Sequence, residues 1–179
     1  MQTGATRAPT SNVGNFARTS RAMRPMPFRE PIDDDWPVIL DIANRAIAHV
    51  PGAGPQTEWL ENRRTFAARG TQQHFVHIER DEVVGYGAME AVRDAPDAYR
   101  LFVVTAPERL ERVGGAIYRE LDARLARVGA KNAWFVEFAA DERFGAFIRA
   151  RGFTEARRFA LASGEPAIVL ARKLDGRDR

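Results

Sequence analysis

Two different periods of apolar residues alternate along residues 27–174, and this alternation limits the folds that the chain can adopt. Between Ile39 and Val50, apolar residues recur every three or four positions, as they do on the buried face of a helix. The segment from Tyr99 to Thr105 is instead a nearly continuous apolar run, which is typical of a strand in the centre of a sheet. The alternation predicts an α/β (α+β) domain in which strands and helices are interleaved.

The predicted elements follow the order β, α, α, β, β, β, α, β, α, β, β. Helices are expected to end at Pro51, Gly70 and Gly152, because proline and glycine stop a helical pattern. An aspartate shortly before Pro37 is expected to cap the first helix. Short polar connections at 81–82 and 163–165 predict antiparallel hairpins. The strands are expected at about 27–30, 74–80, 83–92, 99–105, 133–138, 153–162 and 166–174, and the helices at about 35–50, 57–69, 112–128 and 142–151.

The junction between the central strand and the third helix has the chemistry of a phosphate-binding site. The strand passes through Pro107 and a stretch with Arg109 and Arg112 into Gly114 and Gly115, at the start of the helix. Unpaired N–H groups at a helix N-terminus favour anions, glycines let a phosphate approach, and arginines add positive charge. The alternative is that both glycines only allow tight packing of the helix on the sheet. Neither a P-loop nor a dinucleotide fingerprint is present in the sequence.

This junction and a second motif resemble the GNAT superfamily of acetyl-CoA-dependent N-acyltransferases. The family has Gln/Arg-x-x-Gly-x-Gly/Ala at a helix start, and this chain has Glu111-x-x-Gly114-x-Ala116. The second family motif is Asn-x-x-Ala-x-x-Phe-Tyr-x-x-x-Gly-Phe, which is matched by Asp141-x-x-Phe144-x-x-Phe147-Ile148-x-x-x-Gly152-Phe153. The resemblance covers residues 27–174 and implies a GNAT-like mixed, mostly antiparallel sheet flanked by about four helices.

The resemblance also implies which residues bind acetyl-CoA as the acyl donor, without a metal. The backbone of the central strand would align the pantetheine arm and donate a hydrogen bond to the thioester oxygen. Because Glu111 stands where the family has Arg or Gln, the pyrophosphate contacts are expected to move to Arg109 and Arg112. The implied binding residues are Phe102, Val103, Val104, Arg109, Arg112, Val113, Gly114, Gly115, Ala116, Asp141 and Phe147.

The acid that protonates the leaving group is missing from its usual place. Ile148 occupies the position at which the family often has a tyrosine that protonates the departing thiolate. A thiol has a pKa of about 8.5, so its thiolate leaves without a dedicated acid. Tyr86, Tyr99 and Tyr118 are candidates to replace the tyrosine, although Tyr118 on a helix face is more typical of packing. The sequence does not choose among them.

A general base for the attacking amine is expected at Glu137, at the end of the strand beside the expected cleft. The segment Val136-Glu137-Phe138 resembles the strand end of ribosomal-protein N-terminal acetyltransferases, one residue nearer to the helix cap. The alternative for Glu137 is a solvated strand-end carboxylate. Glu90 is the reserve candidate, and its alternative is an ordinary surface glutamate of a hairpin.

The acceptor side of the expected site is less determined. Loop 50–55, rich in Pro and Gly, is expected to form one wall of the acceptor pocket or a plain turn between helices. Trp59 either stacks on a substrate or packs in the core, and Arg63 and Arg64 either attract an acidic acceptor or form a solvated helix face. His74 and His77 are expected on the same side of one strand, where a polar face is favoured over a metal site because no third ligand is near.

Composition excludes several classes of protein. Without cysteine, the chain has no disulfide, thiolate nucleophile or cysteine-ligated zinc site. No apolar run approaches the roughly 18 residues of a membrane helix, so a soluble, cytoplasmic protein is expected. Of the 27 basic and 24 acidic residues, residues 1–30 hold five arginines and a single acidic residue, which leaves 22 basic and 23 acidic residues in the rest. The near-neutral remainder disfavours nucleic-acid binding.

The segments outside the domain are short. Residues 1–26 contain isolated apolar residues with no periodicity, and are predicted to be a disordered tail. Residues 175–179 form a C-terminal tail. The GNAT resemblance implies one acyltransferase domain at 27–174, which moves an acetyl group to an amine of a small molecule or peptide. The alternatives are a catalytically silent acyl-CoA-binding module and a nucleic-acid binder that uses the arginine tail; a homodimer is compatible with the sequence.

Overall fold

The computed structural model describes residues 27–70 and 72–174, and the predicted tails at 1–26 and 175–179 lie outside these residues. The elements follow the predicted order. The strands are β1 (Phe28–Arg29), β2 (Gln72–Glu79), β3 (Glu82–Val92), β4 (Ala95–Thr105), β5 (Asn132–Phe138), β6 (Thr154–Ala160) and β7 (Pro166–Lys173). The helices are α1 (Asp35–Ile47), α2 (Thr57–Ala68), α3 (Gly115–Arg127) and α4 (Glu142–Arg149). A 3₁₀ turn at Pro107–Arg109 and a π turn at Leu110–Gly114 precede α3.

The strands form one seven-stranded sheet in the order β1-β2-β3-β4-β5-β7-β6. Every neighbouring pair is antiparallel except β4 and β5, which run parallel. This arrangement confirms the expectation of a mixed, mostly antiparallel sheet with four helices. Strands β4 and β5 can run parallel because α3 connects the end of β4 to the start of β5, as a parallel pair requires.

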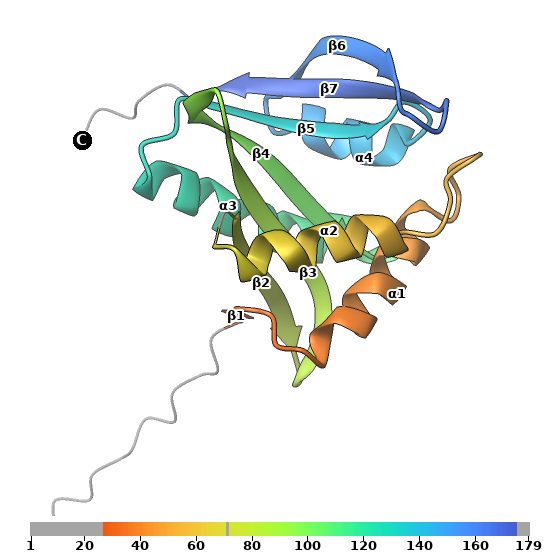
Figure 1. The fold of residues 1–179 in the computed structure, drawn as a ribbon, viewed down its shortest axis with the longest axis vertical. Helices are drawn as coiled ribbons and strands as arrows, with labels where there is room; N and C mark the ends of the chain where they lie inside the picture. Colours follow the sequence, from red (N-terminus) through yellow and green to blue (C-terminus); the bar gives the residue numbers. More distant parts are fainter. Residues whose placement is uncertain (1–26, 71, 175–179) are drawn as a thin grey trace, which may run out of the picture.

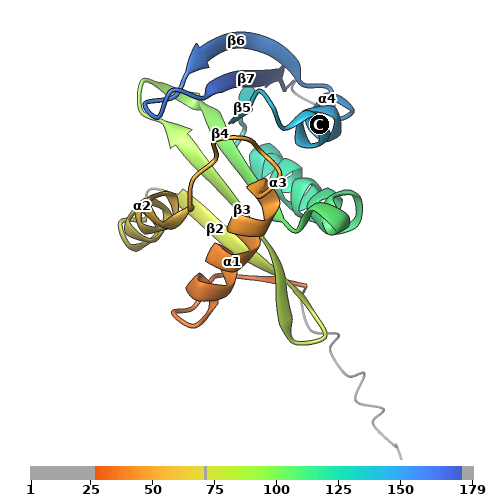
Figure 2. The same cartoon turned by 90° about the vertical axis from the view of Figure 1, so that its right-hand side faces the viewer.

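The helices cover both faces of the sheet, as Figure 2 shows. Helices α1 and α2 pack on one face, around Trp36, Ile39 and Leu60, with Tyr86 of β3 fully buried beneath them. Helices α3 and α4 cover the other face with a larger core. The buried residues of that core include Phe75, Met89, Leu101, Ile117, Leu121, Leu125, Phe135, Phe147, Ile148 and Phe153.

Two glycines of β3 set the distance between the sheet and α3. A Cβ atom at Gly85 would lie 2.7 Å from Cδ1 of Ile117, and one at Gly87 would lie 2.7 Å from Cγ2 of Ile117 and closer still to the ring of Phe75. No side chain fits in that space. The glycines therefore let α3 approach the sheet closely, which fixes the position of the segment that precedes α3.

Two local expectations need correction. Asp34 precedes α1, but its side chain makes no capping hydrogen bond. Asp35 instead accepts from the Ile32 N–H at 2.7 Å and pairs with Arg29 at 2.5 Å, and the Arg29 guanidinium lowers the pKa of this buried carboxyl. The third helix was expected to begin near residue 112, whereas helical winding begins at Pro107 and becomes regular α-helix only at Gly115.

No helix among the described residues is long and apolar enough to span a membrane.

Candidate active site

Strands β4 and β5 part after a short stretch of pairing. Their paired residues run from Ala98 with Asn132 to Arg100 with Trp134, after which each strand continues separately to its end. Figure 1 shows the two strands leaving the same side of the sheet and diverging into a V. Between the arms of the V, backbone N–H and C=O groups on the two facing edges lack partners in the sheet, so they can bind the amides of an extended ligand.

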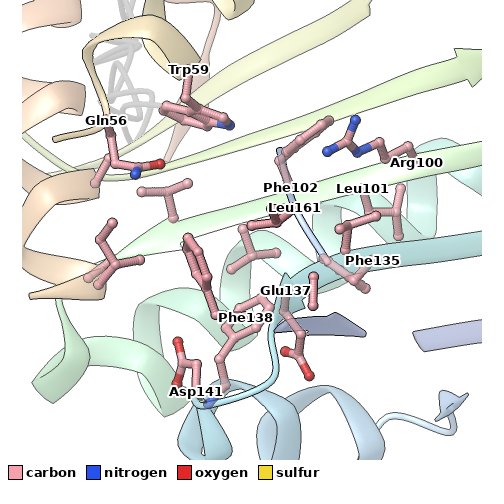
Figure 3. A pocket seen from close by; sticks show the side chains of 18 residues that line it. Gln56, Trp59, Arg100, Leu101, Phe102, Phe135, Glu137, Phe138, Asp141 and Leu161 are labelled. Atoms are coloured by element: carbon pink, nitrogen blue, oxygen red, sulfur yellow. Dashed lines mark hydrogen bonds between the residues drawn. The ribbon is translucent and has the colours of Figure 1, made fainter. Parts of the chain in front are cut away.

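A cavity of about 310 Å³ lies in the opening of the V, as Figure 3 shows. The diverging part of β4 forms one wall, and β5 with the start of α4 forms the other. Residues from α1, α2 and the β6–β7 hairpin complete the lining. The lining residues are Ala43, Ala46, Ile47, Gln56, Trp59, Arg100, Leu101, Phe102, Val103, Val104, Phe135, Val136, Glu137, Phe138, Asp141, Phe144, Leu161 and Ala167.

Glu137 is a buried carboxyl group in the wall of this cavity, not a solvated strand end. Its residue is 7% exposed, and neither carboxylate oxygen has a hydrogen-bond partner within the described part of the chain. Burial raises its pKa to about 7; Arg149 opposes this rise and Asp141 adds to it. In Figure 3 the carboxylate lies on the side of the cavity away from Trp59. A carboxyl group with a pKa near neutrality can accept and release a proton at physiological pH.

Glu90, the reserve candidate, lies outside the cavity lining. It faces α2, where Nη1 of Arg63 donates to its Oε2 at 3.3 Å. Its strand register places it opposite Gln72 on β2 and Arg100 on β4. The structure therefore separates the two glutamates, because Glu137 lines the cavity and Glu90 belongs to a polar cluster beneath α2.

The two glycines of the predicted phosphate site have different surroundings. A Cβ at Gly114 would lie 3.0 Å from Leu110 and 3.4 Å from both Phe147 and Thr105, which is tight packing. A Cβ at Gly115 would meet only Nη2 of Arg151 at 3.5 Å and Nη1 of Arg119 at 3.9 Å. The packing interpretation therefore fits Gly114, while Gly115 is flanked by two guanidinium groups.

The two predicted arginines of this junction also have different surroundings. Arg112 is exposed and forms an ion pair with Glu79 at the end of β2, which lowers the pKa of that carboxyl. Arg109 is half-buried at the end of the 3₁₀ turn. The sequence reasoning missed Arg151, whose guanidinium lies 3.4 Å from the Phe147 ring centroid and donates to the Phe147 carbonyl at 2.5 Å. Its position just before the predicted helix stop carried no recognisable signal.

The remaining predicted cofactor residues fall into two groups. Phe102, Val103, Val104 and Asp141 line the cavity. Phe147 is 2% exposed and packs in the core on the α3–α4 face, apart from the lining. The other predicted residues of the junction, Val113, Gly114, Gly115 and Ala116, belong to the π turn and the first turn of α3.

Two contacts link the halves of the molecule beside the cavity. Asp141 caps α4 by accepting from the Phe144 N–H at 3.0 Å, and Nε2 of His49, just after α1, lies 3.2 Å from the same carboxylate. Loop 50–55 approaches the β6–β7 hairpin, because a Cβ at Gly52 would lie 3.1 Å from Oε1 of Glu165. No residue of this described loop is among the cavity lining, so its role as a wall of the acceptor pocket stays a prediction.

His74 and His77 do not share a face, so that expectation was wrong. His74 contacts Tyr86 on the α1–α2 face, with 2.5 Å between Nδ1 and the hydroxyl, whereas His77 contacts Phe28 and the Pro27 carbonyl. Side chains three residues apart in a strand point to opposite sides, because the strand period is two. Burial lowers the pKa of His74 to about 4, and no group of three metal-ligating side chains is found among residues 27–70 and 72–174.

None of the three tyrosines lines the cavity. Tyr86 is fully buried and bonded to His74, and Tyr118 is buried on α3, so burial raises the pKa of both phenols. Ile148 is also fully buried, on the α3–α4 face. Among the described lining residues there is no tyrosine, serine or threonine hydroxyl that could replace the missing acid.

Comparisons with known proteins support the fold. No protein-family model matches the sequence, and no curated protein matches it either. Solved structures do match: the ribosomal-protein-alanine N-acetyltransferase from Brucella melitensis is 20% identical with a TM-score of 0.66, over 82% of this chain and 99% of that one. The ribosomal-protein-S18-alanine N-acetyltransferase from Escherichia coli is 21% identical with a TM-score of 0.62, over 85% and 97%.

A third similar structure names the superfamily. The GNAT superfamily phosphinothricin acetyltransferase from Sinorhizobium meliloti, in complex with AcCoA, is 21% identical with a TM-score of 0.65, over 82% of this chain and 87% of that one. The seven-stranded sheet with its parted parallel strands is a fold that this chain shares with these N-acetyltransferase structures. This likeness confirms the fold that the two sequence motifs implied.

Proposed function

We propose that the protein is an N-acetyltransferase that moves an acetyl group from acetyl-CoA to an amine by direct attack. The observation that carries this proposal is the parting of β4 and β5 beyond Arg100 and Trp134, around a cavity with the buried carboxyl of Glu137 in its wall. The similar structure from Sinorhizobium meliloti, which is in complex with AcCoA, supports acetyl-CoA as the donor. The cytoplasm remains the compartment that the sequence predicts.

The donor fits the V in an extended form. The pantetheine arm has two amides, and the facing edges of β4 and β5 offer unpaired N–H and C=O groups for them. Phe102, Val103 and Val104 line this part of the cavity, so the acetyl group would lie near Phe102, with the pyrophosphate toward the end of β4. There, Gly115 lies beside Arg151 and Arg119, which bring positive charge to the start of α3.

The reaction forms a bond from the amine nitrogen to the acetyl carbon and breaks the bond from that carbon to sulfur. The electron pair of the broken bond leaves with the sulfur as a thiolate, and the nitrogen loses a proton. Because the thiol has a pKa of about 8.5, the thiolate leaves without a dedicated acid. The alignment of the amine with the thioester supplies much of the rate, because it replaces a bimolecular encounter.

Glu137 is the proposed acceptor of the amine's proton, directly or through a water molecule. Its pKa of about 7 lets it be ionised for the reaction and then exchange the proton with solvent near neutrality. Its carboxylate lies on the opposite side of the cavity from Trp59, so a water molecule is the more natural link to an amine that enters between α1 and α2. Glu90 is not itself a lining residue; it accepts from Arg63 beneath α2 and is the cross-strand neighbour of the lining residue Arg100.

A catalytically silent acyl-CoA-binding module is the second candidate. Its support is that Ile148 is fully buried in place of the family's tyrosine, and that the described lining residues carry no replacement hydroxyl. Such a protein would bind acetyl-CoA in the same V and release no thiol. The two candidates therefore differ in turnover and agree in donor binding.

One experiment separates them. The full chain is titrated with acetyl-CoA by calorimetry and is then incubated with acetyl-CoA and a panel of amines that covers amino acids, small polyamines and short peptides, while free thiol is measured. Binding together with amine-dependent thiol release supports the enzyme. Binding without thiol release for any amine supports the silent module, and an absence of binding refutes both.

A further inference from the structure

A cluster of buried polar side chains lies beside the cavity, on the sheet face covered by α2. Gln72, Glu90 and Arg100 are cross-strand neighbours on β2, β3 and β4, so they form one row across the centre of the sheet. Arg63 reaches this row from α2, with Nη1 3.3 Å from Oε2 of Glu90 and a side chain that is 7% exposed. The helix face that carries Arg63 is therefore buried, unlike that of Arg64, which is 60% exposed and paired with Asp33.

The cluster has more positive charge than negative. The guanidinium carbons of Arg63 and Arg100 lie 4.4 Å and 4.9 Å from the ring centroid of Phe102, so both cations are near the same ring. Glu90 is the carboxylate that faces them. His74, which packs nearby against Tyr86, is neutral because burial lowers its pKa to about 4. Two guanidinium groups thus share one carboxylate, and the cluster carries a net positive charge.

The hydrogen-bonding capacity of the cluster is also unfilled. Nε of Arg63, Nε of Arg100, Nε2 of His74 and both amide atoms of Gln72 are buried without a hydrogen-bond partner in the described ranges 27–70 and 72–174. Buried polar groups are normally paired, and leaving them unpaired costs free energy. Three of these atoms, Nε of Arg63, Nε of Arg100 and Nε2 of Gln72, are donors, and unpaired donors with net positive charge are the environment that an oxyanion would complete.

This cluster opens into the proposed active site through Arg100. Arg100 lines the cavity together with Phe102 and Trp59, and Figure 3 shows its guanidinium beside the Phe102 side chain. Arg100 and Phe102 are two residues apart on one strand, so their Cα atoms are about 7 Å apart along β4. An anionic group held by Arg100 would therefore lie within a few bonds of an amine that attacks a thioester near Phe102.

We propose that the acceptor is an amine that carries a carboxylate one to three carbon atoms away, and that Arg100, supported by Arg63, binds that carboxylate. The proposal rests on the acetyltransferase function and names its substrate class. Arg100 would make a charge-assisted hydrogen bond to the carboxylate, which is stronger than a hydrogen bond between neutral groups. Glu90 holds Arg63 in place, and the aromatic faces of Phe102 and Trp59 enclose the carbon chain.

The first test uses the unmodified chain and compares acids with their amides. The panel contains free L-amino acids with their α-amides, and dipeptides that begin with Asp or Glu with those that begin with Asn or Gln. We expect at least one acid to exceed its amide by tenfold or more in kcat/KM, and the arm in which this occurs identifies free amino acids or acidic N-termini. Equal acceptance of acids and amides would overturn the proposal and leave the acetyltransferase function intact.

The second test removes the charge at Arg100. Arg100→Gln should lower kcat/KM for the preferred acid by about tenfold to 100-fold, mainly through KM, and change the value for its amide by less than threefold. The control is Arg64→Gln on the exposed side of α2, which should change neither value. A loss that is equal for acid and amide would overturn the proposal, as it would show that Arg100 only supports the fold.

A binding measurement separates this proposal from the proposed function. The preferred acid and its amide are titrated into the chain in the presence of CoA, with no turnover required. Tighter binding of the acid by tenfold supports the carboxylate site even if no thiol is released from acetyl-CoA. If no acid of the panel binds more tightly than its amide and none is acetylated faster, the proposal is wrong.

Discussion

The carboxylate of Glu137 occupies the space that a side chain at Gly145 would need. A Cβ atom at position 145 would lie 2.9 Å from Oε1 of Glu137, closer than such atoms approach in proteins. The glycine of α4 therefore allows this carboxyl group to be buried against the helix at the wall of the cavity. The negative charge of Asp141 also makes Glu137 harder to ionise and so contributes to its raised pKa.

The proposed base is tested by Glu137→Gln. A positioned base contributes about 10² to 10⁴ in rate, so turnover near neutral pH should fall by at least 100-fold while acetyl-CoA affinity stays within twofold. The defect should shrink at high pH, where a free amine with a pKa near 10 loses its proton unaided. Steady-state kinetics and calorimetry measure the two effects. Glu90→Gln is the matched comparison: if it loses turnover while Glu137→Gln keeps it, the roles must be exchanged, and if both stay active no protein base is needed.

The raised pKa of Glu137 also predicts how stability depends on pH. The folded protein holds this proton up to about pH 7, whereas the unfolded chain releases it near 4.5, so folding becomes less favourable as pH rises between these values. The difference is on the order of 3 kcal/mol. Denaturant unfolding at pH 5 and pH 8 should show Glu137→Gln gaining stability relative to the unmodified chain by about this amount. A difference that is independent of pH would contradict the raised pKa.

Gly145→Ala tests whether the position of Glu137 matters. The new methyl group displaces the carboxylate, while Arg149, whose Nη1 would be 2.7 Å away, can swing aside. Alanine favours the helix by about 1 kcal/mol over glycine, so the melting temperature should change little. Turnover should fall at least tenfold, with a shifted apparent pKa in the pH–rate profile. Ala146→Ser, on the exposed side of α4, is the control, and an unaltered profile in Gly145→Ala would argue against a role for Glu137.

Substitutions at the two adjacent glycines should affect different properties: acetyl-CoA affinity at Gly115 and stability at Gly114. Gly115→Glu places a carboxylate beside the flexible guanidinium ends of Arg151 and Arg119, which can move aside, so the fold should remain while acetyl-CoA affinity falls by more than 100-fold. Gly114→Ala brings a methyl group to 3.0 Å from Leu110, so it should destabilise the protein by about 1 to 3 kcal/mol. Thermal unfolding and calorimetric titration distinguish them. Unchanged affinity in Gly115→Glu would remove this end of α3 from the donor site.

The start of α3 shows the limit of local sequence patterns. The order of elements follows from apolar periods that are local, and proline and glycine mark most helix ends. The same patterns placed the helix near residue 112, yet winding begins at Pro107 through a 3₁₀ and a π turn. Leu110 and Val113 of that segment are buried against the sheet. The packing of these two side chains therefore accounts for the 3₁₀ turn and the π turn in place of regular α-helix.

The sequence by itself determined the α/β class, the element order and the candidate residues, because period and turn chemistry depend on neighbours along the chain. Only the tertiary structure decided that Glu137 is buried and Glu90 is paired with Arg63. It also decided that Arg63 belongs to a buried cluster with Arg100, although Arg63 and Arg64 are adjacent arginines that local sequence patterns do not distinguish. Burial, unpaired donors and pKa values arise where β2, β3, β4 and α2 meet, and such contacts between distant segments form only when the whole sheet is assembled.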